Sequence, residues 1–376
     1  MPRPHTLTVA VPTEIKPDER RVALTPDGVR ELGAHDVDVV VQAGAGEGAG
    51  IDDDAYRAAG AELAATAEET WERGQLVCKV KEPQAEESTL LRDDLVLFTY
   101  LHLAAYPEVA HALLDAGTTG VAYETVQRAD GQLPLLAPMS EVAGRLAPQV
   151  GARFLEAPQG GRGVLLGGAP GVQPGRVVVI GAGNVGWNAA WVAAGMEAEV
   201  NLLDKDLDRL RFTDQIHRGR ISTLASNRGT LERAVAAADL VIGAVLVAGD
   251  RAPVVVTEEM VASMKPGSVI VDVAIDQGGC IATSEETTHQ DPVFERHGVL
   301  HYCVGNIPGA VPHSATLALT NATLPYLRDL ARLGVTEAGR TDPELALGVN
   351  TEAGKVVNPA VAHSLGLDAA PPSFVA

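Results

Sequence analysis

The chain has 376 residues, a formal net charge of -20 and 46% hydrophobic residues. The negative charge argues against nucleic acid and anionic membrane surfaces as partners, because their phosphates require a basic face. The sequence contains no apolar run long enough to span a bilayer, and its start lacks the order of a signal peptide. At roughly 150 residues per domain, two or three domains are expected.

Short runs rich in β-branched residues alternate with helical stretches in the first third of the chain. Residues 52–74 begin with three aspartates and have the apolar spacing of a helix. Short apolar strands separated by helices are typical of a parallel sheet, so this part predicts an α/β domain. The strand candidates are residues 6–14, 36–44, 75–83, 94–102 and 118–125.

The middle of the chain repeats this alternation and predicts a second α/β unit. Residues 133–157 are expected to form a connecting helix with its N-cap at or beside Ser140. The predicted fold is therefore α/β, with two Rossmann-like parallel-sheet domains flanking a cleft and joined by long helices. The second set of strand candidates comprises residues 176–181, 199–204, 239–245, 267–276 and 301–306.

Residues 313–334 predict a helix bent near Pro325, and a mixed tail follows it. This closing helix can return to the first unit, which would make the first domain discontinuous. We expect a substrate domain formed by residues 1–137 plus 308–376, and an NAD-binding domain formed by residues 138–307.

The segment "VVVIGAGNVGWNAA" carries glycines in the GxGxxG pattern between a strand and a helical stretch. Gly181 permits a tight turn, Gly183 lets the backbone approach a pyrophosphate, and Gly186 lets helix and strand pack closely. The N-terminus of the following helix offers free N–H groups to phosphates. The pattern predicts a dinucleotide site, although an ordinary glycine turn has the same letters.

Asp204 ends the next predicted strand, about 20 residues after Gly183. A carboxylate there can accept hydrogen bonds from both ribose hydroxyls and would repel the extra phosphate of NADP. We therefore expect NAD as the cofactor.

Charged residues stand where predicted strands end, the edge at which open α/β sheets bind ligands. Lys81 and His102 are expected to be the last residues of neighbouring strands, and Asp276 to end a strand of the second unit before two glycines. A histidine in the apolar run "LVLFTYLHLAAYP" can equally be a core residue. Its place beside a lysine favours a functional role. Asp272, inside its predicted strand, is expected to be structural.

These groups suit hydride transfer at an amine-bearing carbon. A guanidinium is the best fixed partner for a substrate carboxylate, so Arg21 is the candidate and Arg20 the alternative. Lys81 can polarise a carbonyl or carboxylate, and His102 can exchange protons near neutral pH. Asp276 can balance a cationic intermediate.

The chain resembles alanine dehydrogenases of the alanine dehydrogenase and pyridine nucleotide transhydrogenase family over nearly its whole length. The resemblance is carried by "PTEIKPDERRVALTP", "KVKEP", "FTYLHLA", "YETVQ", "LPLLAPMSEVAGRLA", "VVVIGAGNVG" and "VDVAIDQGG", in the family's order. It implies reversible NAD-dependent oxidative deamination of L-alanine to pyruvate and ammonium, usually by a hexamer.

Site roles also follow from the resemblance. Arg21 and Lys81 would bind the substrate, and His102 and Asp276 would be the catalytic pair. No metal is implied. The residues implied at the cofactor are Ser140, Gly181, Gly183, Asn184, Val185, Gly186, Asp204, Arg209, Ser226, Val245, Leu246, Val273, Asp276, Val304, Asn306 and Ile307.

Three alternatives stay open at this stage: a soluble NAD(H)-binding subunit of a proton-translocating transhydrogenase, a related small amino-acid dehydrogenase, and a non-catalytic NAD-binding module. The cysteines at 78, 280 and 303 lie far apart, without a disulfide framework or metal-ligand spacing. This cysteine usage is typical of the reducing cytoplasm, where we expect the protein.

Overall fold

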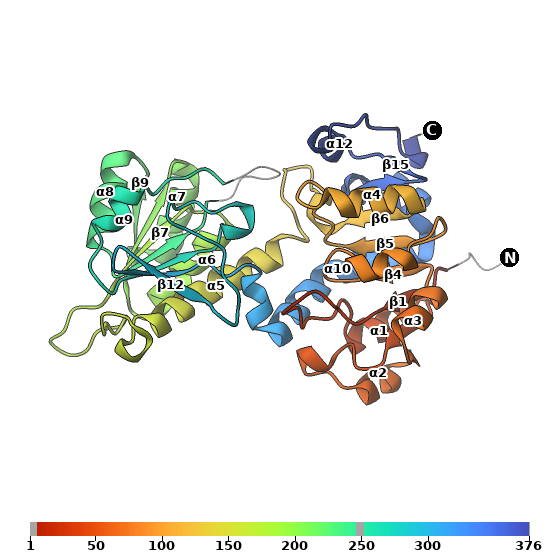
Figure 1. Ribbon diagram of the computed structural model, residues 1–376, viewed down its shortest axis with the longest axis horizontal. Helices are drawn as coiled ribbons and strands as arrows, with labels where there is room; N and C mark the ends of the chain where they lie inside the picture. The colour runs from red at the N-terminus through yellow and green to blue at the C-terminus, as the bar shows by residue number, and fades with distance from the viewer. Residues whose placement is uncertain (1–5, 246–251, 376) are drawn as a thin grey trace. The chain divides into compact units, whose positions relative to one another are not determined.

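The computed structural model describes residues 6–245 and 252–375. The chain divides into two compact units, Met1–Met139 with Val311–Ala376, and Ser140–Ala310 (Figure 1). Each unit is built on one mostly parallel β-sheet, which confirms the predicted α/β class with two sheets. The units are described separately below.

Among the described residues, the sheet of the first unit has the strand order β15-β14-β6-β5-β4-β1-β2-β3. Neighbouring strands from β6 to β3 pair in parallel, whereas β14 pairs antiparallel with both β6 and β15. The strands are β1 (Val9–Val11), β2 (Val39–Gln42), β3 (Glu62–Ala64), β4 (Leu76–Cys78), β5 (Val96–Thr99), β6 (Thr119–Ala122), β14 (Val349–Glu352) and β15 (Lys355–Val356).

In the second unit the order is β12-β13-β11-β10-β7-β8-β9. The strands from β13 to β9 are parallel, and β12 is an antiparallel edge strand. The strands are β7 (Arg176–Ile180), β8 (Glu199–Asp204), β9 (Ile221–Ala225), β10 (Leu240–Gly243), β11 (Val269–Asp272), β12 (Val293–Arg296) and β13 (Val299–Tyr302).

Both sheets have the same parallel core. Numbered along the chain, the six parallel strands of either sheet stand in the spatial order 3-2-1-4-5-6. This is the doubly wound dinucleotide-binding arrangement, in which the order reverses between strands 1 and 4. The reversal falls between β1 and β4 in the first unit and between β7 and β10 in the second, and ligands bind outside such points.

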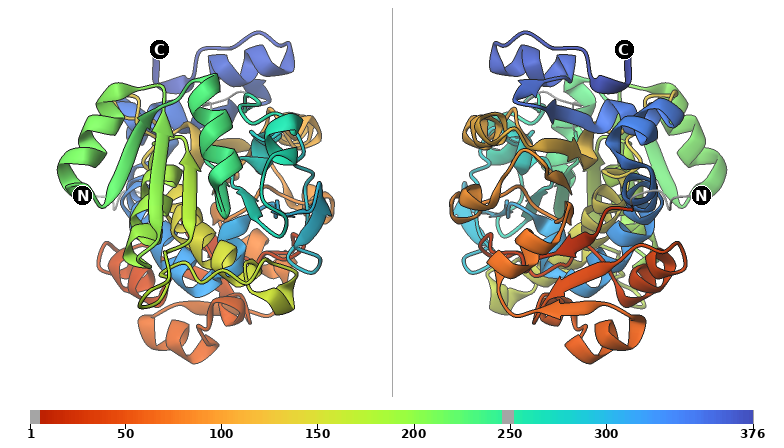
Figure 2. Two further views of the ribbon diagram at one scale, coloured as in Figure 1. Left: turned by 90° about the vertical axis from the view of Figure 1, so that its left-hand side faces the viewer. Right: turned by 90° about the vertical axis from the view of Figure 1, so that its right-hand side faces the viewer.

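The second sheet is buried on both faces, which explains its continuous apolar strands. Alternate residues of β7 enter different cores: Val177 and Val179 pack on one face, Val178 and Ile180 on the other. Two helices, α5 (Ala137–Phe154) and α6 (Asn184–Gly195), contribute to the first of these cores; α8 (Arg228–Ala237) and α9 (Glu258–Ala262) contribute to the second. The left-hand view of Figure 2 shows these green strands between helices. The helices of this unit are α6 (Asn184–Gly195), α7 (Leu207–His217), α8 (Arg228–Ala237) and α9 (Glu258–Ala262).

Helices of the first unit begin at sequence-encoded caps. Thr25, Asp52 and Thr66 accept hydrogen bonds from the first turns of α1, α2 and α3, and a proline opens α1 and α4. The helices are α1 (Pro26–Gly33), α2 (Asp53–Ala59), α3 (Ala67–Arg73), α4 (Pro107–Ala116), α10 (Pro312–Thr341), α11 (Pro343–Gly348) and α12 (Pro359–Leu365), while α5 (Ala137–Phe154) begins here and continues into the second unit.

Three helix predictions are wrong in detail. Residues 52–74 form α2, β3 and α3 rather than one helix, because Gly60 ends α2 in the left-handed conformation and β3 pairs with β2. Helix α5 starts at Ala137, so Ser140 lies inside it and is not its N-cap. The non-helical residue in α10 is Gly334, at φ 71°, and not Pro325.

Several strands are shorter than predicted. Lys81 and His102 follow the ends of β4 and β5 and lie in loops, and His102 has φ of 48°. Asp276 follows β11 in a 3₁₀ turn, Ile275–Gln277. Within the described residues, no helix is both long and apolar enough to cross a membrane.

Candidate active site

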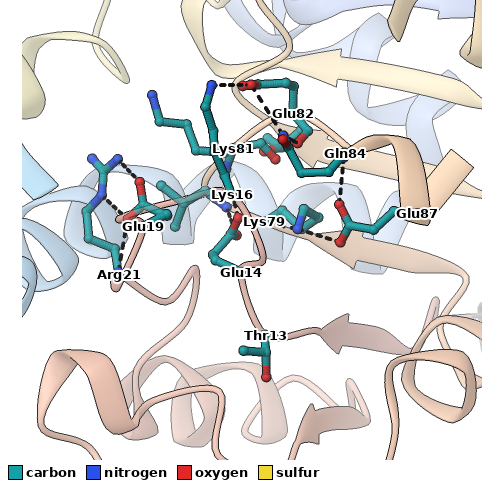
Figure 3. Close-up of polar contacts among 12 residues, drawn as sticks. Thr13, Glu14, Lys16, Glu19, Arg21, Lys79, Lys81, Glu82, Gln84 and Glu87 are labelled. Atoms are coloured by element: carbon teal, nitrogen blue, oxygen red, sulfur yellow. Dashed lines mark hydrogen bonds and ion pairs between the residues drawn. The ribbon is translucent and has the colours of Figure 1, made fainter. Parts of the chain in front are cut away.

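The loops that leave β1 and β4 carry a dense group of charged side chains at the reversal point of the first sheet (Figure 3). Two of its members, Arg21 and Lys81, were predicted from the sequence. The others come from the same two loops, which run from Thr13 to Arg21 and from Lys79 to Glu87. These side chains therefore form a polar site at the position where doubly wound sheets bind ligands.

Arg21 is buried, with 2% of its surface exposed, whereas Arg20 is exposed. Its Nε and backbone N–H donate to Oε1 of Glu19 at 2.7 and 2.9 Å, and Nη2 pairs with Oε2. Nη1 lies 3.0 Å from Sδ of Met139. Burial alone would raise the pKa of Glu19, but Arg21 outweighs it and holds the pKa at about 2. Glu19 therefore fixes the guanidinium in one orientation.

A second buried cation, Lys79, links the two loops. Its Nζ lies 2.7 Å from Oε1 of Glu87 and 3.3 Å from Oε2 of Glu14. Glu14 also accepts a hydrogen bond of 2.5 Å from the backbone N–H of Val80. Burial raises the pKa of Glu14, and Lys79 offsets part of that effect. The side chains of Lys79, Glu14 and Glu87 are all buried, so this cluster fixes the two loops relative to each other.

Lys81 is half-buried and lies within the electrostatic reach of Glu19 and Glu82. Glu82 pairs with Lys16 through Oε1, and Lys16 in turn lies over the ring of Tyr106 at 4.8 Å from its centroid. Burial would raise the pKa of Glu82, but His102 and Lys16 together lower it to about 2. The carboxylates of Glu19 and Glu82 therefore link the candidate substrate-binding residues Arg21 and Lys81 with His102.

His102 is placed by a loop whose backbone is tied to Glu124. Oε1 of Glu124 accepts hydrogen bonds from the backbone N–H of Leu101 at 3.2 Å and of His102 at 2.6 Å. The carbonyl oxygen of His102 accepts from the N–H groups of Ala105 and Tyr106. These bonds support the left-handed backbone at His102 and aim its side chain away from the strand ladder.

The imidazole of His102 is 34% exposed and is not a core histidine. Its ring stacks on Tyr100 at a centroid distance of 5.6 Å and meets Tyr106 edge-on at 6.4 Å. Nδ1 lies 3.6 Å from Oε2 of Glu82. The ring therefore has one nitrogen toward a carboxylate and a partly open surface, as a proton carrier requires.

In the second unit, the glycine loop has the geometry of a phosphate cradle. Gly181 has φ of 101°, and a Cβ there would lie 2.5 Å from the carbonyl oxygen of Ala244. A Cβ on Gly186 would lie 1.7 Å from the carbonyl oxygen of Gly181. Among the described residues, only Nη1 of Arg209 lies within 4 Å of the Cβ position of Gly183, the N-cap of α6. Within that part of the chain, the turn is tightly packed at Gly181 and Gly186 and leaves space at Gly183, beside the N-terminus of α6.

Asp204, the last residue of β8, is buried beside this loop. Its Oδ2 accepts from the N–H of Ala182 at 2.6 Å and its Oδ1 from the N–H of Asp206 at 2.8 Å. Nη1 of Arg209 lies 3.9 Å from Oδ2. The carboxylate is held at the edge of the cradle, with lone pairs left for further donors.

Asp276 follows β11, at the carboxyl ends of the parallel strands of the same sheet. It is exposed, and its Oδ1 accepts a 3.1 Å hydrogen bond from the backbone N–H of Asn306, which has φ of 59°. The turn that carries it continues into Gly278 and Gly279, both at positive φ.

Asp272, predicted to be structural, holds both ends of this turn. It is fully buried and accepts hydrogen bonds from the N–H groups of Ala274, Cys280 and Ile281 at 3.1, 3.0 and 3.2 Å, and from the Ser284 hydroxyl at 2.7 Å. Its carboxylate faces protein donors rather than a ligand.

The remaining cofactor candidates lie on the same edge or on the helix beside it. A Cβ on Gly144 of α5 would lie 2.3 Å from the carbonyl oxygen of Val185, so α5 touches the glycine loop. Ser140 stands one turn earlier on the same helix face. Leu246 lies outside the described residues. Asn184 opens α6; the others follow parallel strands, with Ser226 after β9, Val245 after β10, Val273 after β11, and Val304 and Ile307 after β13.

Sequence reasoning missed the anionic half of the first site. Glu19 pairs with Arg21, Glu82 faces the ring of His102 at 3.6 Å, and Glu124 accepts from the His102 backbone. The alternation of charges in "PTEIKPDERR" and "KVKEP" was the available signal. Within residues 6–245 and 252–375, no group of three or more His, Cys, Asp or Glu side chains is placed to hold a metal ion.

Together, the fold and the two sites define a dinucleotide-binding enzyme with two Rossmann-like units, one carrying a glycine cradle and one a cation pair with an imidazole. Two family models match the chain, the alanine dehydrogenase/PNT N-terminal domain over residues 10–143 and the C-terminal domain over residues 147–359. The chain therefore belongs to the alanine dehydrogenase/PNT family.

Individual relatives agree with this assignment. The alanine dehydrogenase of Mycolicibacterium smegmatis is 55% identical, over 96% of this chain and 97% of the relative. A solved structure titled L-alanine dehydrogenase superposes with a TM-score of 0.93 at 50% identity, covering 96% of this chain and 99% of that one. A transhydrogenase structure from Sinorhizobium meliloti gives 0.81 at 29% identity, covering 93% and 100%.

Proposed function

We propose that the protein is an L-alanine dehydrogenase. In this reaction L-alanine, NAD and water give pyruvate, ammonium, NADH and a proton, and the reverse direction aminates pyruvate. The observation that carries the proposal is the linked set of Arg21, Lys81 and His102, because it offers two cations to a carboxylate beside a titratable imidazole. Full-length relatives that carry this name support it.

The cofactor would be NAD, bound by the second unit. The open position above Gly183 and the N–H groups at the start of α6 fit a pyrophosphate. Asp204 fits the ribose hydroxyls and disfavours the extra phosphate of NADP, with Arg209 beside it. When bound, the nicotinamide supplies a hydride acceptor. The other proposed contacts are those of Ser140, Asn184, Val185, Ser226, Val245, Leu246, Val273, Val304, Asn306 and Ile307.

The residues of the first unit would bind the amino acid and move its protons. Arg21, already oriented by Glu19, would hold the substrate carboxylate, and Lys81 would add a second positive charge. His102 would take a proton from the amine or from the attacking water and return it in the reverse direction. Asp276, in the second unit, remains the proposed catalytic carboxylate that balances cationic intermediates.

A spectrophotometric screen of NADH formation tests this function. L-Alanine is expected to give the highest kcat/KM among small amino acids including glycine and serine, and NADP is expected to be the poorer cofactor. His102→Ala should lower kcat at least a hundredfold. His111→Ala, an exposed histidine on α4, is the matched control and should keep normal activity. Normal alanine-dependent activity in His102→Ala would refute the assignment.

A soluble transhydrogenase subunit is the second candidate, favoured by the likeness to the Sinorhizobium meliloti structure. Such a subunit would pass hydride between two nicotinamides and would need neither a carboxylate clamp nor an imidazole. Hydride exchange between NADH and an NAD analogue in the absence of an amino acid, together with no alanine-dependent NADH, would favour it.

We also propose a cytoplasmic homo-oligomer, a hexamer as the family resemblance implies. Cys78, Cys280 and Cys303 are buried free thiols, which suits a reducing compartment. Trp191 on α6 and Phe212 on α7 are large apolar side chains that remain exposed in the isolated chain. Light scattering during size-exclusion chromatography measures the oligomeric state directly.

A further inference from the structure

Glu82 has a role toward His102 that the proposed function does not include. Resting on that function, we propose that Glu82 is the positioning residue that fixes the ring tautomer of His102. The carboxylate would hold the proton on Nδ1 and so present Nε2 to the substrate.

The surroundings of Glu82 leave one of its oxygens directed at the imidazole. The side chain is 3% exposed, and Pro83 restricts the backbone of Glu82 to an extended conformation. Oε1 is taken by Lys16 and lies 3.4 Å from Nε2 of Gln84. Oε2 is buried without a hydrogen-bond partner among the described residues, and Nδ1 of His102 lies 3.6 Å from it.

A buried carboxylate oxygen without a donor is costly, by about 1–3 kcal/mol or more for a charged group. The separation of 3.6 Å exceeds a normal hydrogen bond by about 0.5 Å, which a small side-chain rotation removes. The ring is otherwise restrained by its stacking on Tyr100. Closing this bond would satisfy Oε2 and select the Nδ1–H tautomer.

Among the charged groups around the ring of His102, Glu82 is the carboxylate that faces Nδ1. Lys16 and Lys81 are cations that disfavour a charged imidazole, whereas Glu82 favours it. Glu124 faces the backbone N–H groups of residues 101 and 102, and Tyr106 meets the ring by its edge. Without Glu82, the imidazole would face a mainly cationic environment and would lose the carboxylate oxygen that can accept from Nδ1.

The test measures the ring tautomer of His102 directly. Nitrogen NMR of protein labelled with 15N-histidine, assigned by the signals lost in His102→Ala, distinguishes a proton on Nδ1 from one on Nε2. His111 is exposed on α4 and serves as the internal control. In Glu82→Gln the neutral ring of His102 should lose its preference for a proton on Nδ1, and the signals of His111 should not change.

Catalysis should respond in a way that a purely structural role would not produce. Glu82→Gln should lower kcat roughly tenfold to a hundredfold, with KM for alanine changed less than about threefold.

The unmodified protein keeps the test decisive if Glu82→Gln folds poorly, because the proposal requires a proton on Nδ1 there. Lys16 is partly exposed, so Lys16→Met should fold, and it should keep this tautomer because Lys16 pairs with the other oxygen of Glu82. A proton on Nε2 in the neutral His102 ring of the unmodified protein, or an unchanged tautomer in folded Glu82→Gln, would overturn the proposal. The NMR measurement needs no substrate, so it stands even if alanine proves not to be oxidised.

Discussion

Replacement of Arg21 by methionine should destabilise the first unit, because it leaves Glu19 as a buried carboxylate without its partner. The pKa of Glu19 is lowered from 4.5 to about 2, a shift of 4.5 − 2 = 2.5 units. At 1.36 kcal/mol per unit this corresponds to about 3 kcal/mol of interaction. Breaking one partner from a buried ion pair typically costs about 3–5 kcal/mol, so both routes give the same magnitude.

The effect should depend on pH in a defined direction. A depressed carboxyl pKa contributes stability that is complete above the unfolded value and is lost as pH falls from about 4.5 to about 2. In Arg21→Met, burial without a partner raises the pKa of Glu19 instead. The difference in stability between the two proteins should therefore narrow as the pH is lowered through that raised value.

Urea denaturation followed by circular dichroism, at about pH 7.5 and about pH 5, measures both effects. Adding Glu19→Gln to Arg21→Met should recover at least half of the lost stability. Arg30→Met is the control: its pair with Asp27 is exposed, and its loss should change stability by less than about 0.5 kcal/mol. A loss below about 1 kcal/mol for Arg21→Met, or no recovery in the double variant, would refute the reasoning.

Other substitutions separate packing from ligand contact in the second unit. Gly186→Ala should lower the thermal midpoint and abolish NADH binding, because its Cβ would meet the carbonyl oxygen of Gly181. Gly183→Ala should weaken NADH binding without a change in the thermal midpoint. Equal thermal midpoints of the two variants in calorimetry would contradict this. Asp204→Asn should reduce the preference for NAD over NADP at least about tenfold in kcat/KM, equivalent to about 1.4 kcal/mol, and an unchanged ratio would show that the carboxylate does not discriminate. Asp272→Ala should lower the free energy of unfolding in urea by about 3 kcal/mol or more, because it leaves several buried N–H groups unpaired. A near-neutral result would show that these hydrogen bonds do not stabilise the turn.

The repeated local patterns of this sequence were enough to predict much of the architecture. Runs such as "RVVVI" became buried parallel strands because β-branched residues suit a pleated, enclosed surface. The glycines at 181, 183 and 186 predicted their own turn: Gly181 has a positive φ, Gly186 has no room for a Cβ beside the carbonyl oxygen of Gly181, and Gly183 completes the spacing of the dinucleotide-binding pattern. These features depend on interactions between near neighbours, which a linear sequence displays.

Other features were decided only by tertiary pairing. Strand β3 lies in a segment with helical spacing, and it forms a strand because β2 offers a parallel partner. The acidic partners Glu19, Glu82 and Glu124 looked like ordinary surface charges. Only the meeting of the loops after β1, β4, β5 and β6 placed them beside Arg21 and His102, with Glu19 and Glu82 buried and Glu124 partly buried. Burial and partner choice arise between residues far apart in the chain, and it is burial that converts a weak surface charge into a strong orienting interaction.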